Sequence, residues 1–162
     1  MKGLKFAAIA SFALLIVVLA LVGYLFWIAE VEIVDVQIRS TPVSAEELEQ
    51  LKLAVEQDTF YGTLFQKPRQ WLQASEYVWL TYQLRIRNHC LVPLDMLEVQ
   101  VVPSADDVLQ TAALQVKSLD LKSEGVIDAT ILTTRNTHSI RELITTYYLW
   151  GVSGNTKTVY GQ

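Results

Sequence analysis

The amino-terminal part of the chain carries one long apolar run, from Phe6 to Ile28. Within this run only Ser11, Gly23 and Tyr24 are not plainly apolar, and no residue is charged. A helix rises about 1.5 Å per residue, so roughly 20 apolar residues cross the hydrocarbon core of a bilayer. Because a lone segment in lipid must satisfy its own backbone hydrogen bonds, the run predicts a single transmembrane helix, Phe6–Ile28.

The charges on the two sides of this run differ in sign. Lys2 and Lys5 precede it, whereas Glu30 and Glu32 follow it. Positive charge beside a membrane-spanning segment stays on the cytoplasmic side, so we expect a cytoplasmic amino terminus. A signal-anchor of this kind divides the chain into a transmembrane anchor, residues 1–29, and an extracytoplasmic domain, residues 30–162. A cleaved signal peptide has a similar pattern with a shorter apolar core, and it would export the same domain.

Beyond residue 29 the pattern changes to short runs of alternating apolar and polar residues, which are typical of strands with one buried face. The clearest covers residues 76–88, where Leu84 should point into a core and Gln83 into solvent. Ile33 and Val34 are adjacent apolar residues that interrupt the alternation of residues 31–39, and they predict a bulge. The remaining expected strands are residues 97–101, 127–132, 140–150 and 156–160.

Two further stretches have less regular patterns. Residues 108–121 fit either a short helix or one or two strands, and we favour a strand over residues 114–121. The polar residues 104–107 before them are expected to form a loop. Residues 151–155 contain two glycines and predict a hairpin turn before the last strand.

One segment of the domain has helical periodicity. Ser44 is followed three residues later by Glu47, which is the signature of a capping box. Apolar residues then recur at helical spacing, so we expect a short helix from Ala45 to about Glu56.

Four aromatic residues, Phe60, Tyr61, Phe65 and Trp71, follow the predicted helix. They fit either an exposed binding patch or hydrophobic cover for a sheet edge. We favour the second interpretation, because large exposed apolar patches are uncommon on exported domains.

Short strands separated by turns predict two packed antiparallel sheets. The stretch of residues 84–88, the Pro93-containing loop of residues 91–94 and the strand at 97–101 resemble membrane-anchored immunoglobulin-like domains of the late-embryogenesis-abundant and FxLYD types. Residues 120–132 resemble the strand–turn–strand pattern of the same domains, whereas the predicted short helix departs from it. The resemblance implies an all-β, immunoglobulin-like β-sandwich with a binding or structural role and without catalytic residues.

The composition of the domain restricts its partners. All 17 acidic residues and 11 of the 13 basic ones lie in residues 30–162, which gives this part a formal charge of −6. Nucleic acids and anionic lipids bind basic surfaces, so neither is expected as the main partner. Cys90 is the only cysteine, so no disulfide can form within one chain.

Few residues are candidates for chemistry. Cys90 with His138 as a base would be a nucleophile pair, but nothing in the surrounding sequence supports it, and we favour a packed thiol. His89 and Cys90 are adjacent and would point to opposite faces of a strand, which disfavours a shared metal ion. We therefore predict no catalytic, metal-binding or cofactor-binding residue, and the chain is not expected to be an enzyme.

Three aspartates are candidates for a calcium site. Asp106 and Asp107 with Asp95 would supply oxygen ligands, but the spacing of an oxygen-rich calcium loop is absent. We therefore expect these carboxylates to be solvated in loops.

Two functional hypotheses follow. In the first, the chain is a single-pass, non-catalytic accessory or structural subunit of a membrane-associated assembly, held by Phe6–Ile28 and by protein–protein interaction in or near the membrane. Small residues such as Ala10 and Ser11 permit close helix packing and favour it slightly. In the second, it is a freestanding surface domain that binds an extracellular ligand or protein. A membrane-anchored enzyme is a third and weaker alternative.

Overall fold

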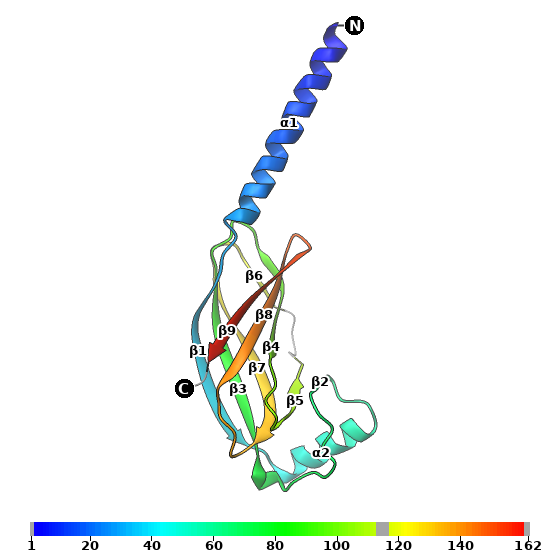
Figure 1. The fold of residues 1–162 in the computed structure, drawn as a ribbon, viewed down its shortest axis with the longest axis vertical. Helices are drawn as coiled ribbons and strands as arrows, with labels where there is room; N and C mark the ends of the chain where they lie inside the picture. The colour runs from blue at the N-terminus through cyan, green and yellow to red at the C-terminus, as the bar shows by residue number, and fades with distance from the viewer. Residues whose placement is uncertain (1, 113–116, 161–162) are drawn as a thin grey trace.

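The computed structural model describes residues 2–112 and 117–160. One long helix projects from an elongated β-sheet domain, and a second, short helix lies at the far end of that domain (Figure 1). The elements are α1 (Lys2–Trp27), β1 (Val31–Pro42), α2 (Ala45–Glu56), β2 (Gly62–Leu64), η1 (Ala74–Glu76), β3 (Tyr77–Asn88), β4 (Leu94–Val101), β5 (Asp107–Thr111), β6 (Lys117–Leu119), β7 (Glu124–Thr134), β8 (Arg141–Leu149) and β9 (Val152–Tyr160).

The helix α1 confirms the length and composition expected of the apolar run. Its 21-residue segment Ala7–Trp27 is long and apolar enough to cross a membrane, and its side chains are not buried, although Phe26 near its end packs against the main core. This helix is therefore consistent with a membrane anchor or with a signal sequence.

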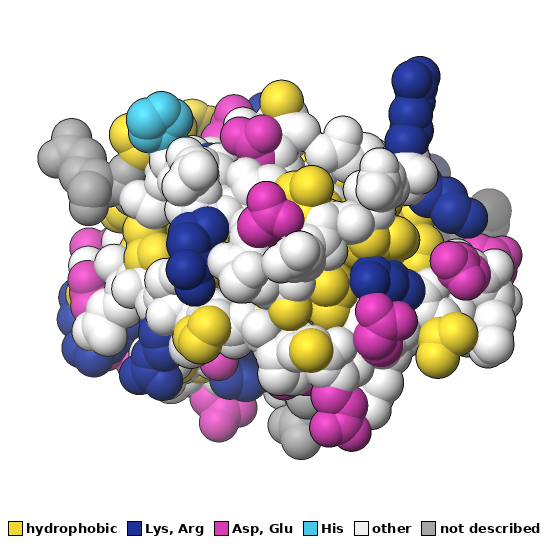
Figure 2. Space-filling model, turned by 90° about the horizontal axis from the view of Figure 1, so that it is seen from below, with side chains coloured by type: hydrophobic (Ala, Val, Ile, Leu, Met, Phe, Trp, Pro, Cys, Tyr) yellow, Lys and Arg dark blue, Asp and Glu magenta, His cyan; other side chains and the backbone are white. Residues whose placement is uncertain are grey.

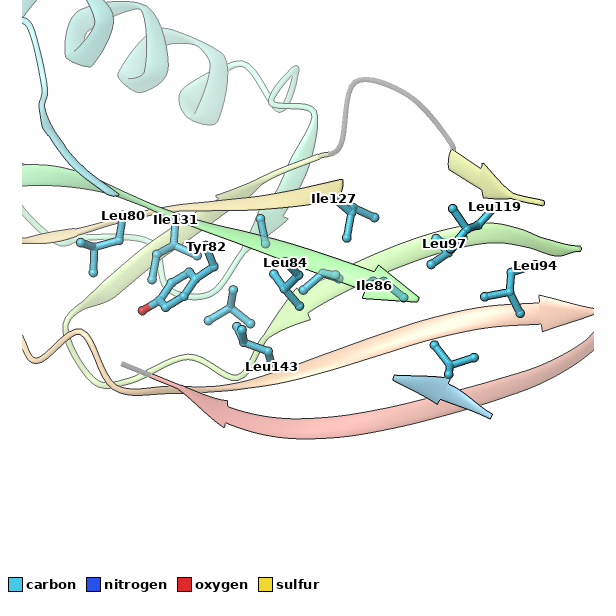
Figure 3. Packing of buried hydrophobic residues seen from close by; sticks show 14 of the residues in the cluster. Leu80, Tyr82, Leu84, Ile86, Leu94, Leu97, Leu119, Ile127, Ile131 and Leu143 are labelled. Atoms are coloured by element: carbon cyan, nitrogen blue, oxygen red, sulfur yellow. The ribbon is translucent and has the colours of Figure 1, made fainter. Parts of the chain in front are cut away.

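The described strands form two antiparallel sheets. The first has the order β1-β3-β7-β5-β2, and the second has the order β6-β4-β8-β9. Both sheets contribute side chains to one hydrophobic core. Figure 3 shows Tyr82 and Leu84 of β3 and Leu143 of β8 lying between the sheets. A two-sheet architecture with an amino-terminal apolar helix and one short helix is thus confirmed.

The strand β3 confirms the alternation predicted from the sequence. Leu84 is completely buried, whereas Gln83 beside it is exposed. The predicted bulge is also present, because the pairing of β1 with β3 shifts register between Ile33 and Asp35. The period-two pattern therefore gave the correct face of this sheet.

The last hairpin corrects the predicted turn. Strand β9 begins at Val152, and Gly154 pairs with Tyr147 within the ladder. The turn is formed by Trp150 and Gly151, which both have positive φ, 49° and 80°. Two such residues make the tight connection whose twist matches the strands, so no longer loop is needed. The expectation of a turn over residues 151–155 was wrong.

The ambiguous residues 108–121 contain two short strands, β5 and β6, in different sheets. Part of the favoured strand, residues 114–116, lies outside the described residues. The polar stretch before it was expected to end with Asp107, but Asp107 instead begins β5 and is buried.

Helix α2 confirms the capping box. The Ser44 hydroxyl accepts a hydrogen bond from the Glu47 N–H at 3.2 Å, and the Glu47 carboxylate accepts one from the Ser44 N–H at 3.0 Å. Leu48 and Val55 are buried in a second, smaller hydrophobic cluster with residues of β5 and β7. This cluster closes the end of the domain opposite α1 (Figure 1).

Candidate functional site

The end of the domain beside α1, here called the helix-proximal end, is formed by the β3–β4 loop (residues 89–93), the β6–β7 turn (residues 120–123) and the β8–β9 turn (Figure 1). The helix joins it directly. The Phe26 ring meets the Trp150 ring edge-on with centroids 6.0 Å apart. The backbone N–H of His89 donates to the carbonyl of Glu30 at 3.0 Å. The helix therefore contacts the β8–β9 turn, and the linker after the helix contacts the β3–β4 loop.

Asn88, the last residue of β3, ties two of these connections together. Its side chain is completely buried. Its amide nitrogen donates to the carbonyls of Val92 at 3.0 Å and Asp120 at 2.9 Å, and it lies 3.3 Å from the carbonyl of Leu119. Its amide oxygen accepts from the N–H of Cys90 at 2.8 Å. One side chain thus satisfies polar backbone groups of both the β3–β4 loop and the β6–β7 turn.

Charged side chains surround the same end on strands β1, β3 and β7. The Arg87 Nε donates to Glu124 Oε1 at 2.6 Å, and the His89 Nε2 lies 2.7 Å from Glu32 Oε2. The hydrogen bond to His89 lowers the pKa of Glu32, and the bond to Glu124 raises the pKa of Arg87. These partly exposed pairs contribute little stability each. They link side chains of β1, of β7 and of the end of β3 with its following loop, next to α1.

The thiol of Cys90 lies inside the helix-proximal end. It is buried, and its Sγ is 3.6 Å from the carbonyl of Glu30. Burial raises the pKa of this thiol, which disfavours the reactive thiolate. The structure therefore presents Cys90 as a packing residue.

His138 lies at the opposite end of the domain. It follows β7, whose Thr134 pairs with Tyr77 at the start of β3, whereas Cys90 follows the end of that strand. A strand of 12 residues at about 3.3 Å per residue separates the two by roughly 35 Å. The structure does not bring the candidate nucleophile Cys90 and the candidate base His138 together.

The carboxylate of Asp107 is not solvated, and the expectation that it would be was wrong. Asp107 is completely buried and forms a bidentate ion pair with Arg141, with Nε–Oδ2 at 2.7 Å and Nη2–Oδ1 at 2.8 Å. Burial alone would raise the pKa of Asp107, but the bonds from Arg141 and the Ser104 N–H bring this pKa below its usual value. Arg141 also donates to the carbonyls of His138 and Ile140. The pair therefore fixes the β7–β8 connection.

The expectation of a solvated loop carboxylate is confirmed for Asp106, whereas Asp95 is solvated but lies in strand β4 and not in a loop. Asp95 and Asp106 are exposed. Among residues 2–112 and 117–160, no group of three or more His, Cys, Asp or Glu side chains lies close enough to hold a metal ion.

The four aromatic residues after α2 do not form one patch. Phe60 and Trp71 pack against the smaller hydrophobic cluster, and Phe65 packs against the main core. The Trp71 and Tyr77 rings meet edge-on with centroids 6.2 Å apart. The interpretation as hydrophobic cover is confirmed for these three residues. It is wrong for Tyr61, which is 81% exposed.

Tyr61 borders a groove between the β2–β5 edge and β4. The groove has a volume of about 400 Å³, and Met96 and Gln110 contribute to its walls. Gly62 also lines the groove, and a larger residue would not fit at this position, because a Cβ atom there would lie 2.3 Å from the carbonyl oxygen of Gln110. The groove is a small, mixed polar and apolar surface feature.

The sequence analysis missed both buried polar side chains that organise the two ends of the domain. The sequence analysis gives Asn88 no role at the end of its strand, and it expects the carboxylate of Asp107 in solvent. A signal was present for the second, because Arg141 begins an apolar strand and needs an anion when it is buried. When the chain is compared with protein-family models and with curated proteins, no match is found.

Proposed function

We propose that the chain is a single-pass, membrane-anchored extracytoplasmic protein with an immunoglobulin-like β-sandwich, acting as a non-catalytic accessory or structural subunit of a membrane-associated assembly. Its amino terminus is cytoplasmic, and residues 30–162 lie on the other side of the membrane.

The observation that carries this proposal is the direct connection between α1 and the sheets. No residue of the largely apolar segment Ala7–Trp27 is fully buried, and most of its surface is available to lipid or to another helix. Only residues 28–30 separate α1 from β1, and Phe26 and Ala29 already pack against the main core. A domain joined in this way is held at a fixed place beside its anchor, as a subunit docked on a membrane protein requires.

The non-catalytic role is supported by how the chemically capable side chains are used. Cys90 is buried, with a raised thiol pKa. The Asp107 carboxylate is occupied by Arg141, and Glu32 is engaged by His89. These groups stabilise strands and loops, and the resemblance to immunoglobulin-like domains also favours binding or structure over catalysis.

The alternative is a freestanding domain that binds an extracellular ligand or protein. The groove beside Tyr61 and Met96 favours it, because both side chains are exposed and Tyr is common in binding surfaces. The two alternatives place the partner at different positions, on α1 or on the groove.

Site-specific photocrosslinking in native membranes tests the proposal. A photoreactive phenylalanine derivative is placed at Ala10 on α1 or at Tyr61 beside the groove, and both positions are exposed. The subunit proposal expects one discrete membrane-protein adduct from Ala10 after the membranes have been washed with alkaline carbonate. An adduct from Tyr61 alone would favour the alternative. A chain released by the carbonate wash would contradict the anchor itself.

A further inference from the structure

We propose that the helix-proximal end is a membrane-docking surface, in which the tips of the β3–β4, β6–β7 and β8–β9 connections insert apolar side chains into the interface of the bilayer that α1 crosses. This inference rests on the proposed membrane anchor. The occupant is the boundary between headgroups and acyl chains of zwitterionic lipid.

Each of the three connections exposes a large apolar side chain. Leu91 in the β3–β4 loop is 49% exposed, Leu121 in the β6–β7 turn is 54% exposed and Trp150 in the β8–β9 turn is 53% exposed. Single exposed apolar residues are ordinary on soluble surfaces. Leu53, Leu72 and Ile140 at the opposite end are exposed to a similar degree. The three on these connections are set apart by their position, because all of them lie at the end where α1 leaves the domain.

The chain at this end places the three tips close to the membrane. Residues 28–30 span at most about 10 Å when fully extended, because a residue covers no more than about 3.6 Å. The real connection is shorter, since the N–H groups of Ile28 and Ala29 still bond to carbonyls of α1. Trp27 is 88% exposed at the end of α1, and indole rings favour the membrane interface. The tips therefore lie at the depth where Trp27 leaves the bilayer.

The tips are held rigidly before any lipid binds. Asn88 bonds to both the β3–β4 loop and the β6–β7 turn, and the Lys122 ammonium donates to the carbonyl of His89 at 2.8 Å across the two connections. Trp150 is fixed against Phe26. A preorganised surface loses little conformational freedom when it docks, which favours binding through a small contact.

The charges identify the lipid chemistry. This end carries two cations, Arg87 and Lys122, against four carboxylates, those of Glu30, Glu32, Asp120 and Glu124. Arg87 is already paired with Glu124 and Glu32, so the rim is acidic on balance. An acidic rim gives no attraction to anionic headgroups, so apolar insertion into zwitterionic lipid supplies the contact. The opposite end also carries charged side chains of both signs, interspersed with apolar ones (Figure 2), so the position beside α1 is what distinguishes the helix-proximal end.

The test measures the depth of a spin label on the full chain in phosphatidylcholine liposomes. In a Cys90→Ser background, Leu121→Cys places a nitroxide at a docking tip, and Asn136→Cys places one in an exposed turn at the opposite end. Oxygen concentrates in lipid, whereas a nickel chelate stays in water. We expect a several-fold higher ratio of oxygen to nickel collisions at position 121 than at position 136. Equal, water-like ratios would overturn the docking surface.

A second measurement avoids both cysteine variants. Lipids brominated near the headgroups should quench tryptophan fluorescence of the wild-type chain more than that of Trp150→Phe. Unchanged quenching would count against insertion of Trp150. Flotation with the liposomes separates the two proposals: a floating chain with water-exposed tips overturns docking alone, whereas a chain that does not float overturns both the anchor and the docking.

Discussion

Replacing Asn88 should show how much of the domain's stability depends on one buried amide. Asn88→Ala removes the acceptor for the Cys90 N–H and the donor for the carbonyls of Val92 and Asp120. Leaving a buried polar group without its partner costs about 1–3 kcal/mol. Two or three backbone groups lose their partner, and part of the cost is recovered where the loops let water reach these groups. The free energy of unfolding should therefore fall by about 3–5 kcal/mol. That is a large share of the roughly 5–15 kcal/mol that stabilises a domain.

Asn88→Asp makes the same test dependent on pH. A carboxylate keeps the shape and can accept from Cys90, but it would face the carbonyl oxygens of Val92 and Asp120 without a proton to donate. Its pKa in the folded domain should therefore lie above the unfolded value of about 3.9. Its destabilisation relative to wild type should grow as pH rises above about 4, by at most about 1.4 kcal/mol per pH unit.

The assay is urea unfolding of the full chain in nanodiscs, followed by near-ultraviolet circular dichroism at pH 4 and pH 7. Asn136→Ala is the matched control, because Asn136 is exposed in a turn and should change stability by less than about 0.5 kcal/mol. If Asn88→Ala lost no more stability than the control, the inference that Asn88 holds the two connections would be refuted.

Two further predictions concern the core and the opposite end. Leu84→Asp places an unpaired charge in the main core and should lower the free energy of unfolding by several kcal/mol, whereas Gln83→Asp on the exposed face should lower it by less than about 1 kcal/mol. Equal losses of this free energy in urea unfolding would contradict the assigned faces. Asp107→Asn leaves Arg141 buried without its anion and should cost about 3–5 kcal/mol at neutral pH. The pKa of Asp107 is lower in the folded domain than in the unfolded chain, so the wild-type ion pair stabilises the domain fully above pH of about 4 and loses this effect as the pH falls through the folded pKa. The difference in the free energy of unfolding between variant and wild type should therefore narrow in acid. A difference that stays constant from pH 7 to pH 2 would show that the ion pair is not the cause.

Local sequence patterns were sufficient to predict the elements that are determined by residues close together in the chain. The capping box of α2 needs only Ser44 and Glu47, which lie three residues apart. The faces of β3 follow from period-two alternation, and the bulge in β1 follows from the adjacent Ile33 and Val34. The length of α1 follows from an uninterrupted apolar run.

Other features depend on residues that are distant in the chain, and no local pattern carries them. Asp107 is buried because Arg141, 34 positions later, neutralises it. The short strand β2 exists because Gly62 to Leu64 can pair with β5. The role of Asn88 depends on carbonyls more than 30 positions away. The candidate site was missed for this reason.

The hairpin turn was missed for a different, local reason. Trp150 has a positive φ, which residues with a Cβ atom rarely adopt. The sequence pattern therefore placed the turn on the glycines, Gly151 and Gly154. The contact of Trp150 with Phe26 is available to hold this conformation.

The proposed function requires that α1 remains attached to the chain and that the sheets lie outside the cell membrane. The direct measurement adds protease to intact cells and follows a carboxy-terminal tag on the full chain. The molecular mass of the chain in the membrane fraction is determined in the same experiment. We expect a membrane-bound chain of the full 18.3 kDa plus the tag, and we expect external protease to digest the tag without lysis. A soluble, shortened chain would contradict the anchor, and a tag that is cleaved only after lysis would contradict the orientation.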